Sequence, residues 1–273
     1  MANLTWMWAG PPLFFSMRPG RLQSSARDAD FSSSGSALGT IPAREQVRVL
    51  LFDIDGTLLF SGGAGKRAMT MAFREVFGVD DGFAGISMSG KTDTQILREA
   101  LAKWGRELDA GLAERFRRRY FEYLRVTMND STPGKRLVPG VSELLRELDR
   151  RTDALVGLLT GNWRESAYIK LAYFGLDGYF RFGAFADDSE DRNALVPFAI
   201  QRASELAGHP LSPEDTWVIG DTPRDVECGL AHGTRVLGVA ASEYGEETLL
   251  AAGATHVVKD FRDPRRILSL LLS

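Results

Sequence analysis

Residues 47–59 read VRVLLFDIDGTLL, a compact apolar run that ends in two aspartates and a glycine. The apolar and β-branched residues 47–52 predict a buried strand. Asp53 and Asp55 follow it two positions apart, so continued strand geometry would place both carboxylates on one side of a sheet. Two carboxylates that close raise each other's pKa unless a cation lies between them, and Mg²⁺ prefers such hard oxygen ligands.

Three other interpretations of this stretch fit the residues less well. An Asp-Gly surface turn would not explain the apolar strand before the aspartates or the apolar residues 58–60 after them. A calcium-binding EF-hand loop would need Gly and Glu where Leu58 and Ala64 stand. A phosphate-binding P-loop would need Gly and Ser or Thr where Phe60 and Arg67 stand.

The rest of the chain alternates apolar runs with amphipathic patterns. Further strands are predicted at 154–159, 181–185, 216–219, 235–239 and 255–258. Apolar residues at three- and four-residue spacing predict helices at 141–150, 164–174, 194–207, 223–231, 246–252 and 264–272. Because strand and helix alternate with short connections, we predict an α/β fold with a doubly wound, Rossmann-like parallel sheet covered on both faces.

Polar side chains stand where three of the predicted strands end. Asp53 follows the first strand, Thr160 follows the run at 154–159, and Asp221 follows the run at 216–219. Folds of this kind place ligands at the carboxyl ends of their strands. The sequence therefore predicts a functional site formed by these three positions.

The segment between the first strand and the helix near Val141 contains no strand-like run and is too long for a simple crossover. Helices are predicted at 66–77, 92–104 and 112–128. We expect an inserted helical domain at 62–138, with 46–61 and 139–273 forming the α/β core. Its internal apolar seam is predicted to contain Trp104, Phe116, Tyr120, Phe121 and Leu124.

Composition narrows the class of protein. The 273 residues are 44% hydrophobic and 25% charged, which is typical of a globular protein. The net charge of −3 gives no reason to expect a nucleic-acid partner, and no apolar run is long enough to span a membrane. Cys228 is the only cysteine, which fits a reducing, cytoplasmic location, and we expect it to be a buried small residue rather than a nucleophile.

Residues 1–45 are rich in Ser, Gly and Pro, and we expect a disordered N-terminal extension. An organelle-targeting peptide is a weaker interpretation, because Asp28 and Asp30 interrupt the Arg- and Ser-rich pattern. A misassigned start, with Met17 as the true first residue, is an equal alternative.

The order of these motifs resembles the haloacid dehalogenase superfamily. The resemblance is carried by the run at 53–57, by Thr160, and by the residues GDTPRD at 220–225. The helical insert resembles the class I caps of phosphoglycolate-phosphatase-like members. The resemblance covers residues 47 to about 272, and it implies a phosphatase that hydrolyses a small phosphorylated metabolite through an aspartyl-phosphate intermediate.

The resemblance also implies roles for the aspartates. Asp53 would be the nucleophile, and Asp55 would act as general acid and then as general base. Mg²⁺ would be held by the Asp53 carboxylate, the Asp55 backbone carbonyl and the Asp221 carboxylate. Asp225 would orient the cation of the site without binding the metal.

The remaining site residues are expected to bind phosphate or substrate. Thr160 and the backbone of Gly161 and Asn162 would bind phosphoryl oxygens. Family members usually carry a lysine after the third strand. Here Arg192 is the cation at that place, and it is expected to fill the role of the lysine. The alternative is a surface arginine that pairs with the acidic run before it. In the segment SGKTD at 89–93, Lys91 would contact the leaving group, unless the segment serves only to turn the chain and cap a helix; Lys66 is a second candidate.

Other functions share these motifs. A phosphomutase has the same core, and a phosphonate hydrolase would need Lys66 or Lys91 to form a Schiff base. Dehalogenation is disfavoured, since metal-free dehalogenases need no second acidic residue at position 55. The alternative from another class is a catalytically silent binding protein that keeps the fold. A monomer or a homodimer is expected.

Overall fold

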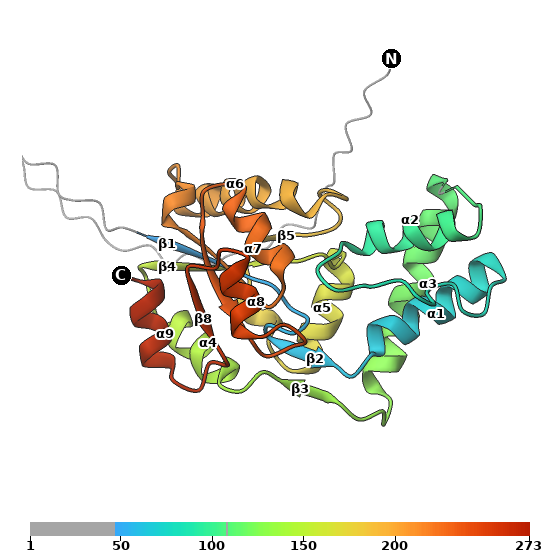
Figure 1. Cartoon of the computed structure of the whole chain (residues 1–273), viewed down its shortest axis with the longest axis horizontal. Coiled ribbons are helices and arrows are strands. Elements are labelled where there is room, and N and C mark those ends of the chain that lie inside the picture. Colours follow the sequence, from blue (N-terminus) through green and yellow to red (C-terminus); the bar gives the residue numbers. More distant parts are fainter. Residues whose placement is uncertain (1–46, 108) are drawn as a thin grey trace, which may run out of the picture. The chain divides into compact units, whose positions relative to one another are not determined.

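The computed structural model describes residues 47–107 and 109–273, so the prediction of a disordered extension at 1–45 lies outside the described residues. The strands are β1 (Arg48–Phe52), β2 (Leu59–Ser61), β3 (Lys135–Leu137), β4 (Ala154–Leu159), β5 (Gly183–Ala184), β6 (Thr216–Gly220), β7 (Arg235–Val239) and β8 (His256–Val258) (Figure 1). The α-helices are α1 (Ala64–Phe77), α2 (Asp93–Lys103), α3 (Ala110–Asn129), α4 (Val141–Asp149), α5 (Arg164–Tyr173), α6 (Leu195–Ala207), α7 (Pro223–Leu230), α8 (Glu246–Ala251) and α9 (Pro264–Leu271).

Six strands form one parallel sheet in the order β5-β4-β1-β6-β7-β8, which confirms the predicted doubly wound α/β fold. β1 lies in the middle, and its register places Phe52 beside Leu158 on β4 and Ile219 on β6. The three strands therefore end level with one another. The run at 181–185 keeps strand pairing only at Gly183–Ala184.

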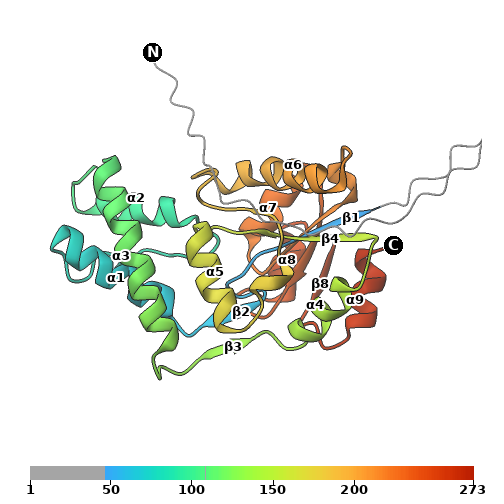
Figure 2. The ribbon, with the colours of Figure 1, turned by 180° about the vertical axis from the view of Figure 1, so that it is seen from behind.

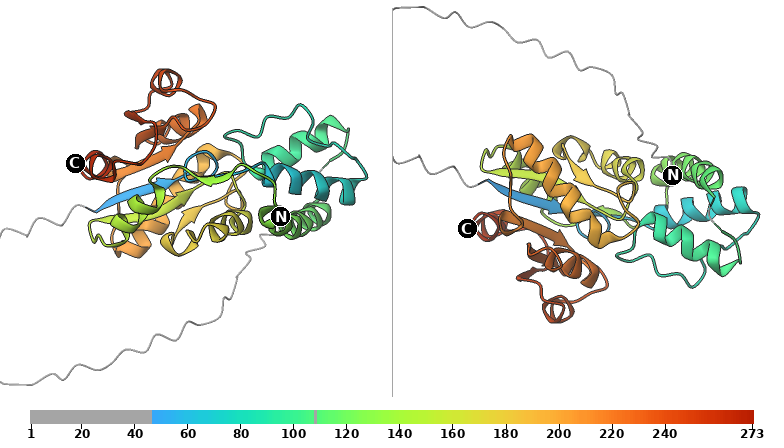
Figure 3. Two further views of the ribbon diagram at one scale, coloured as in Figure 1. Left: turned by 90° about the horizontal axis from the view of Figure 1, so that it is seen from below. Right: turned by 90° about the horizontal axis from the view of Figure 1, so that it is seen from above.

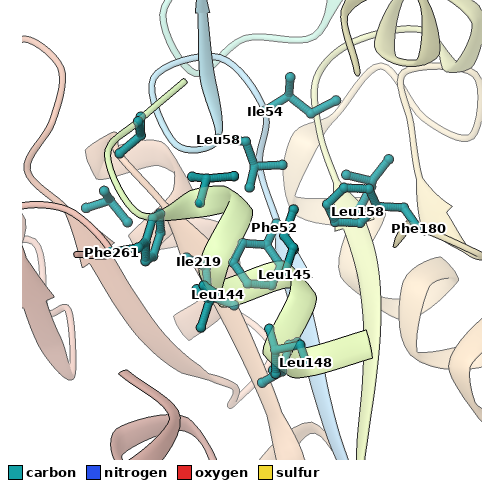
Figure 4. Close-up of a cluster of buried hydrophobic side chains, with 14 of the residues drawn as sticks. Phe52, Ile54, Leu58, Leu144, Leu145, Leu148, Leu158, Phe180, Ile219 and Phe261 are labelled. Carbon is teal, nitrogen blue, oxygen red and sulfur yellow. The ribbon is translucent and has the colours of Figure 1, made fainter. Parts of the chain in front are cut away.

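Helices cover both faces of this sheet, because successive side chains of β1 point in opposite directions. Leu50 and Phe52 pack with residues of α4, α5 and α9 on one face. Val49 and Leu51 pack with residues of α6, α7 and α8 on the other. Figures 2 and 3 show the two helical layers from further directions, and Figure 4 shows Phe52 among the leucines of α4. A strand buried on both faces explains why β1 is a continuous apolar run.

Helices α1, α2 and α3 share an apolar cluster, to which Trp163 and Ala186, from the loops after β4 and β5, also belong. Phe116, Tyr120, Phe121 and Leu124 of α3 are buried in it, as predicted. The prediction was wrong for Trp104, which is 46% exposed. Trp104 is the residue that follows the last turn of α2, where the chain turns away from the helix and its apolar face.

The expectation of no strand between β1 and Val141 was also wrong. β2 and β3 pair as a short antiparallel ladder, with Leu59 opposite Leu137. Each strand has three residues, too few to show a period of two, and the partners are far apart in the sequence. This ladder joins both ends of the helical segment to the sheet. Within the described part of the chain, no helix has the length and apolarity that a membrane crossing requires.

Candidate active site

The site lies where the level ends of β4, β1 and β6 meet. Asp53 directly follows β1, Thr160 follows β4 and Asp221 follows β6. The structure thus brings together the three strand-end residues that the sequence singled out. All three are buried: Thr160 has no exposed surface, and Asp53 and Asp221 keep only a few per cent.

The turn after β1 fits tightly against Asp221. Gly56 adopts a φ of 89°, a left-handed conformation that favours glycine. A Cβ at Gly56 would lie 2.2 Å from Asp221 Oδ2, so a side chain there would displace the carboxylate. Thr57 Oγ1 donates a hydrogen bond of 2.9 Å to Asp221 Oδ1. The turn therefore holds one carboxylate oxygen of Asp221 by a hydrogen bond and fits closely against the other.

Asp225 is held by the start of α7. Thr222 is the N-cap of this helix and forms a capping box with Asp225, whose Oδ2 accepts from the Thr222 backbone N–H (3.0 Å) and hydroxyl (2.8 Å). Asp225 Oδ1 accepts from the Arg192 guanidinium. Both carboxylate oxygens thus have protein donors, which fits a residue that orients the site better than one that binds a metal.

Arg192 is the cation beside the predicted nucleophile. It begins the 3₁₀ turn Arg192–Ala194 just before α6, and its side chain is 7% exposed. Its Nη2 lies 3.0 Å from Asp53 Oδ1 and also contacts Asp225 Oδ1. One nitrogen therefore links the two aspartates, and the alternative of a surface arginine was wrong. Cys228, fully buried as predicted, donates to the Arg192 carbonyl.

The site contains more buried carboxylates than buried cations, and this imbalance affects their pKa values. Burial is the main cause that raises the pKa of Asp53 to about 6, although Arg192 acts to lower it. Burial, with repulsion from Asp225 and Asp53, raises the pKa of Asp221 well above its ordinary value. The carboxylates of Asp53, Asp221 and Asp225 offer oxygens within 4.8 Å of one another. Because the Asp225 oxygens already have protein donors, a hard divalent cation fits the oxygens of Asp53 and Asp221, where it would offset the charge that Arg192 alone leaves uncompensated.

The loop after β4 faces the second aspartate of the first motif. Asn162 Nδ2 donates to Asp55 Oδ2 (2.9 Å) and to Thr160 Oγ1 (2.8 Å). A Cβ at Gly161 would lie 2.1 Å from the Lys91 carbonyl, so glycine allows the chain before α2 to approach. Gly161 and Asn162 line a cavity with Asp53 and Asp55, whereas the fully buried Thr160 is not among its lining residues.

This cavity has a volume of about 310 Å³ and lies between the sheet edge and the helical segment. Its apolar lining includes Met69 and Ile96 from α1 and α2, and Lys66 and Lys91 also line it. Lys91 Nζ forms an ion pair with Glu99 at 2.5 Å. Lys66 is exposed and has no ion pair among the described residues. Both lysines thus line this cavity, and a contact of either one with the leaving group stays a prediction.

Two residues of this region were missed by the sequence analysis. Lys170 on α5 reaches Asp55, and Asp93 at the start of α2 accepts from the Trp163 backbone N–H (2.9 Å) and the Ser166 hydroxyl (3.0 Å). The available signal was periodicity, since Lys170 stands on the same helical face as Ser166, a face that is otherwise small or apolar. A lysine on the buried face of a helix needs an acidic partner.

The chain is similar to several known proteins. A family model described as haloacid dehalogenase-like hydrolase matches residues 47–233, more than half of the chain. The pyrophosphatase PpaX of Oceanobacillus iheyensis is 23% identical over 218 residues, which cover 80% of this chain and 94% of that protein.

Two solved structures resemble the fold. A predicted phosphoglycolate phosphatase from Haemophilus somnus has a TM-score of 0.60 at 20% identity, covering 81% of this chain and 98% of that one. A hydrolase from Pseudomonas syringae has a TM-score of 0.62 at 22% identity, covering 83% and 100%. At these identities the likeness is one of fold.

Proposed function

The chain belongs to the haloacid dehalogenase-like hydrolase family, and from this membership and the site's geometry we propose that it is a Mg²⁺-dependent phosphatase acting through an aspartyl-phosphate intermediate. The observation that carries the proposal is the buried Asp53 carboxylate, 3.0 Å from Arg192 and beside Asp221, at the edge of a cavity that also contains Asp55. A nucleophile, an acid–base group and a cation-holding pair thus meet at one point.

The proposed reaction has two steps. An Asp53 oxygen attacks phosphorus as the bond to the leaving oxygen breaks, and Asp55 gives its proton to that oxygen. Asp55, now ionised, then takes a proton from the water that attacks phosphorus, and the bond to Asp53 breaks to release phosphate. Arg192 holds Asp53 in place and offsets its charge.

The metal would be held by the carboxylates of Asp53 and Asp221 and by the backbone carbonyl of Asp55. When bound, Mg²⁺ supplies positive charge next to the phosphoryl oxygens. The backbone N–H groups of Gly161 and Asn162 would bind those oxygens. Thr160, expected from the sequence to share this role, does not line the cavity, and its hydroxyl accepts from Asn162 and so holds the loop. Asp225 would act through Arg192 and not on the metal.

We further propose that residues 62–138 form a cap over a core made of 46–61 and 139–273. Helices α1–α3 supply most of one apolar cluster, which Trp163 and Ala186 join from the core side, and β2 and β3 connect these helices to the sheet. A cavity of this size between cap and core fits a small phosphorylated metabolite, with Lys91 placed to contact the leaving group. A cytoplasmic location and a monomeric or homodimeric state stay predictions from the sequence.

The proposal is tested by hydrolysis of p-nitrophenyl phosphate. We expect activity with Mg²⁺ that EDTA abolishes and that Asp53→Asn removes, because an amide cannot serve as the nucleophile. Asp153→Asn is the matched control, since Asp153 pairs with Arg151 on the surface and precedes β4, at the opposite end of that strand from Thr160. Turnover that persists in EDTA, or in Asp53→Asn, would contradict the mechanism.

A panel of phosphorylated metabolites identifies the substrate, and it should include inorganic pyrophosphate because one relative is named a pyrophosphatase. Release of inorganic phosphate supports a phosphatase, whereas an isomeric phosphate ester as product identifies a phosphomutase. For a phosphonate hydrolase, borohydride with substrate would trap an adduct on Lys66 or Lys91. A silent binding protein would bind members of the panel without turnover.

A further inference from the structure

Lys170 is a buried lysine whose ammonium group contacts the proposed acid–base residue. It lies on α5, and its side chain is 6% exposed. Its Nζ lies 2.5 Å from Asp55 Oδ2 and 2.6 Å from Asn162 Oδ1. An ammonium group this deeply buried is costly unless it is paired, so the contact with Asp55 stabilises both partners.

The surroundings of Lys170 hold its ammonium in one place. Asn162 accepts from Lys170 through Oδ1 and donates to Asp55 Oδ2 through Nδ2, so the three side chains form a closed triangle of hydrogen bonds. From the cap, the backbone of α1 covers the group, since a Cβ at Gly65 would lie 3.6 Å from Nζ. The buried carboxylate of Asp93 adds a favourable electrostatic interaction with Lys170.

The two carboxylate oxygens of Asp55 differ in their hydrogen-bond donors. Oδ2 accepts from both Lys170 and Asn162, whereas Oδ1 has no hydrogen-bond donor among the described residues. The Asp55 side chain is 40% exposed and lines the cavity. One oxygen is therefore fixed, and the other is left for the substrate.

We infer that Lys170 is a positioning residue for Asp55: together with Asn162 it fixes Oδ2 so that Oδ1 faces the leaving oxygen of the substrate. The inference rests on the proposed function. In the first step the Asp55 proton moves to the leaving oxygen and leaves a carboxylate. The Lys170 ammonium is then the ion-pair partner of that carboxylate, so it stabilises the charge that this step creates.

If Lys170 positions Asp55 for proton donation, the loss of activity in a Lys170 variant depends on how basic the leaving group is. Phenyl phosphate and p-nitrophenyl phosphate present the same phosphoryl group on rings of similar shape. Phenoxide is the more basic leaving group and needs the proton from Asp55, whereas p-nitrophenolate leaves without it. The value of kcat/KM reports the steps up to loss of the leaving group, so it isolates proton donation from the later attack by water.

The test compares Lys170→Met, Lys170→Arg and the control Arg48→Met on both esters. Arg48 forms a buried pair with Asp215 at the amino end of β1, the opposite end of that strand from the site. For Lys170→Met we expect kcat/KM on phenyl phosphate to fall about tenfold or more beyond the fall on p-nitrophenyl phosphate, a part of the roughly 10²–10⁴-fold effect of general acid catalysis. Lys170→Arg keeps the charge but changes the length and shape of the side chain. We therefore expect a smaller fall in kcat/KM on phenyl phosphate relative to p-nitrophenyl phosphate. Arg48→Met should leave the ratio of the kcat/KM values on the two esters unchanged.

Each outcome decides the inference. Equal losses on the two esters in Lys170→Met mean that Lys170 supports only the fold, and the inference is overturned. If Lys170→Met does not fold, Lys170→Arg decides in its place, since an unchanged ester ratio there would also overturn it. Wild-type protein that hydrolyses neither ester with Mg²⁺ would overturn the proposed function itself, a result distinct from hydrolysis with an unaltered ratio.

Discussion

Arg192→Met is the perturbation with the largest expected effect on stability. The guanidinium and its two partners are all buried, with exposed side-chain fractions of 7% for Arg192, 9% for Asp53 and 1% for Asp225. Both aspartates contact the same nitrogen, so the variant removes one cation and leaves two buried carboxylates facing each other. Removing one partner of a buried ion pair lowers the free energy of unfolding by about 3–5 kcal/mol. We expect a loss in this range, counted once, because one nitrogen makes both contacts.

The loss is measured by urea unfolding followed by circular dichroism, at neutral pH and in EDTA so that no metal offsets the missing charge. In a chain of this size, about 3–5 kcal/mol corresponds to a fall in Tm of roughly 6–20 °C. Arg192→Lys should recover part of the loss. A single ammonium can contact both carboxylates as Nη2 does, but the lysine side chain is shorter by about one bond.

The matched control is Arg125→Met. Arg125 pairs with Glu165, and both side chains are about half exposed, so the free energy of unfolding should change by at most about 1 kcal/mol. A loss for Arg192→Met that is no larger than the loss for this control would refute the reasoning, because it would mean that the buried carboxylates have another source of positive charge.

Two further variants test the contact between the proposed cap, residues 62–138, and the rest of the chain. Gly161→Ala would place a Cβ 2.1 Å from the Lys91 carbonyl, and we expect KM for p-nitrophenyl phosphate to rise with little change in Tm if the cap yields, whereas unchanged kinetics would show that the contact is dispensable. Burial raises the pKa of Asp93 to about 6, above the ordinary value that the unfolded chain keeps. The folded state therefore holds the proton more tightly, and the stability of the wild type relative to Asp93→Asn falls as pH rises from about 4 to 6, by roughly 3 kcal/mol for two units. Urea unfolding of both proteins at pH 4.5 and 7.5 should show about 2 kcal/mol of this difference, because pH 4.5 already lies above the ordinary pKa. A gap that does not change with pH would contradict it.

The core of the fold was predictable because its signals are local. Each central strand is buried on both faces, so its whole length is apolar, and each ends at a polar residue that needs a partner. The parallel arrangement follows from the alternation with helices, and it brings Asp53, Thr160 and Asp221 to one edge. Arg192 could be singled out because it was the one cation between the acidic run and the next helix.

The features that were missed depend on contacts between distant parts of the chain. The β2–β3 ladder pairs two three-residue strands across the whole helical segment, and neither strand has a pattern of its own. Trp104 was assigned to the seam from helical spacing, although α2 ends one residue before it. Asp93 was quoted only as part of the cap loop, because its partners on α5 and in the loop before it lie some seventy residues away.

Lys170 has both a local sequence signal and a contact with a distant part of the chain. Its position on the inner face of α5 is a local signal, because a charge on that face requires a buried partner. Which carboxylate would be the partner was not local, since Asp55 lies at the end of a different strand, 115 positions away. In the proposed mechanism the two aspartates are the groups that react, and Lys170, which we infer to orient the second one, comes from a helix outside the motif. The ratio of kcat/KM on the two aryl esters would measure how firmly Asp55 is held.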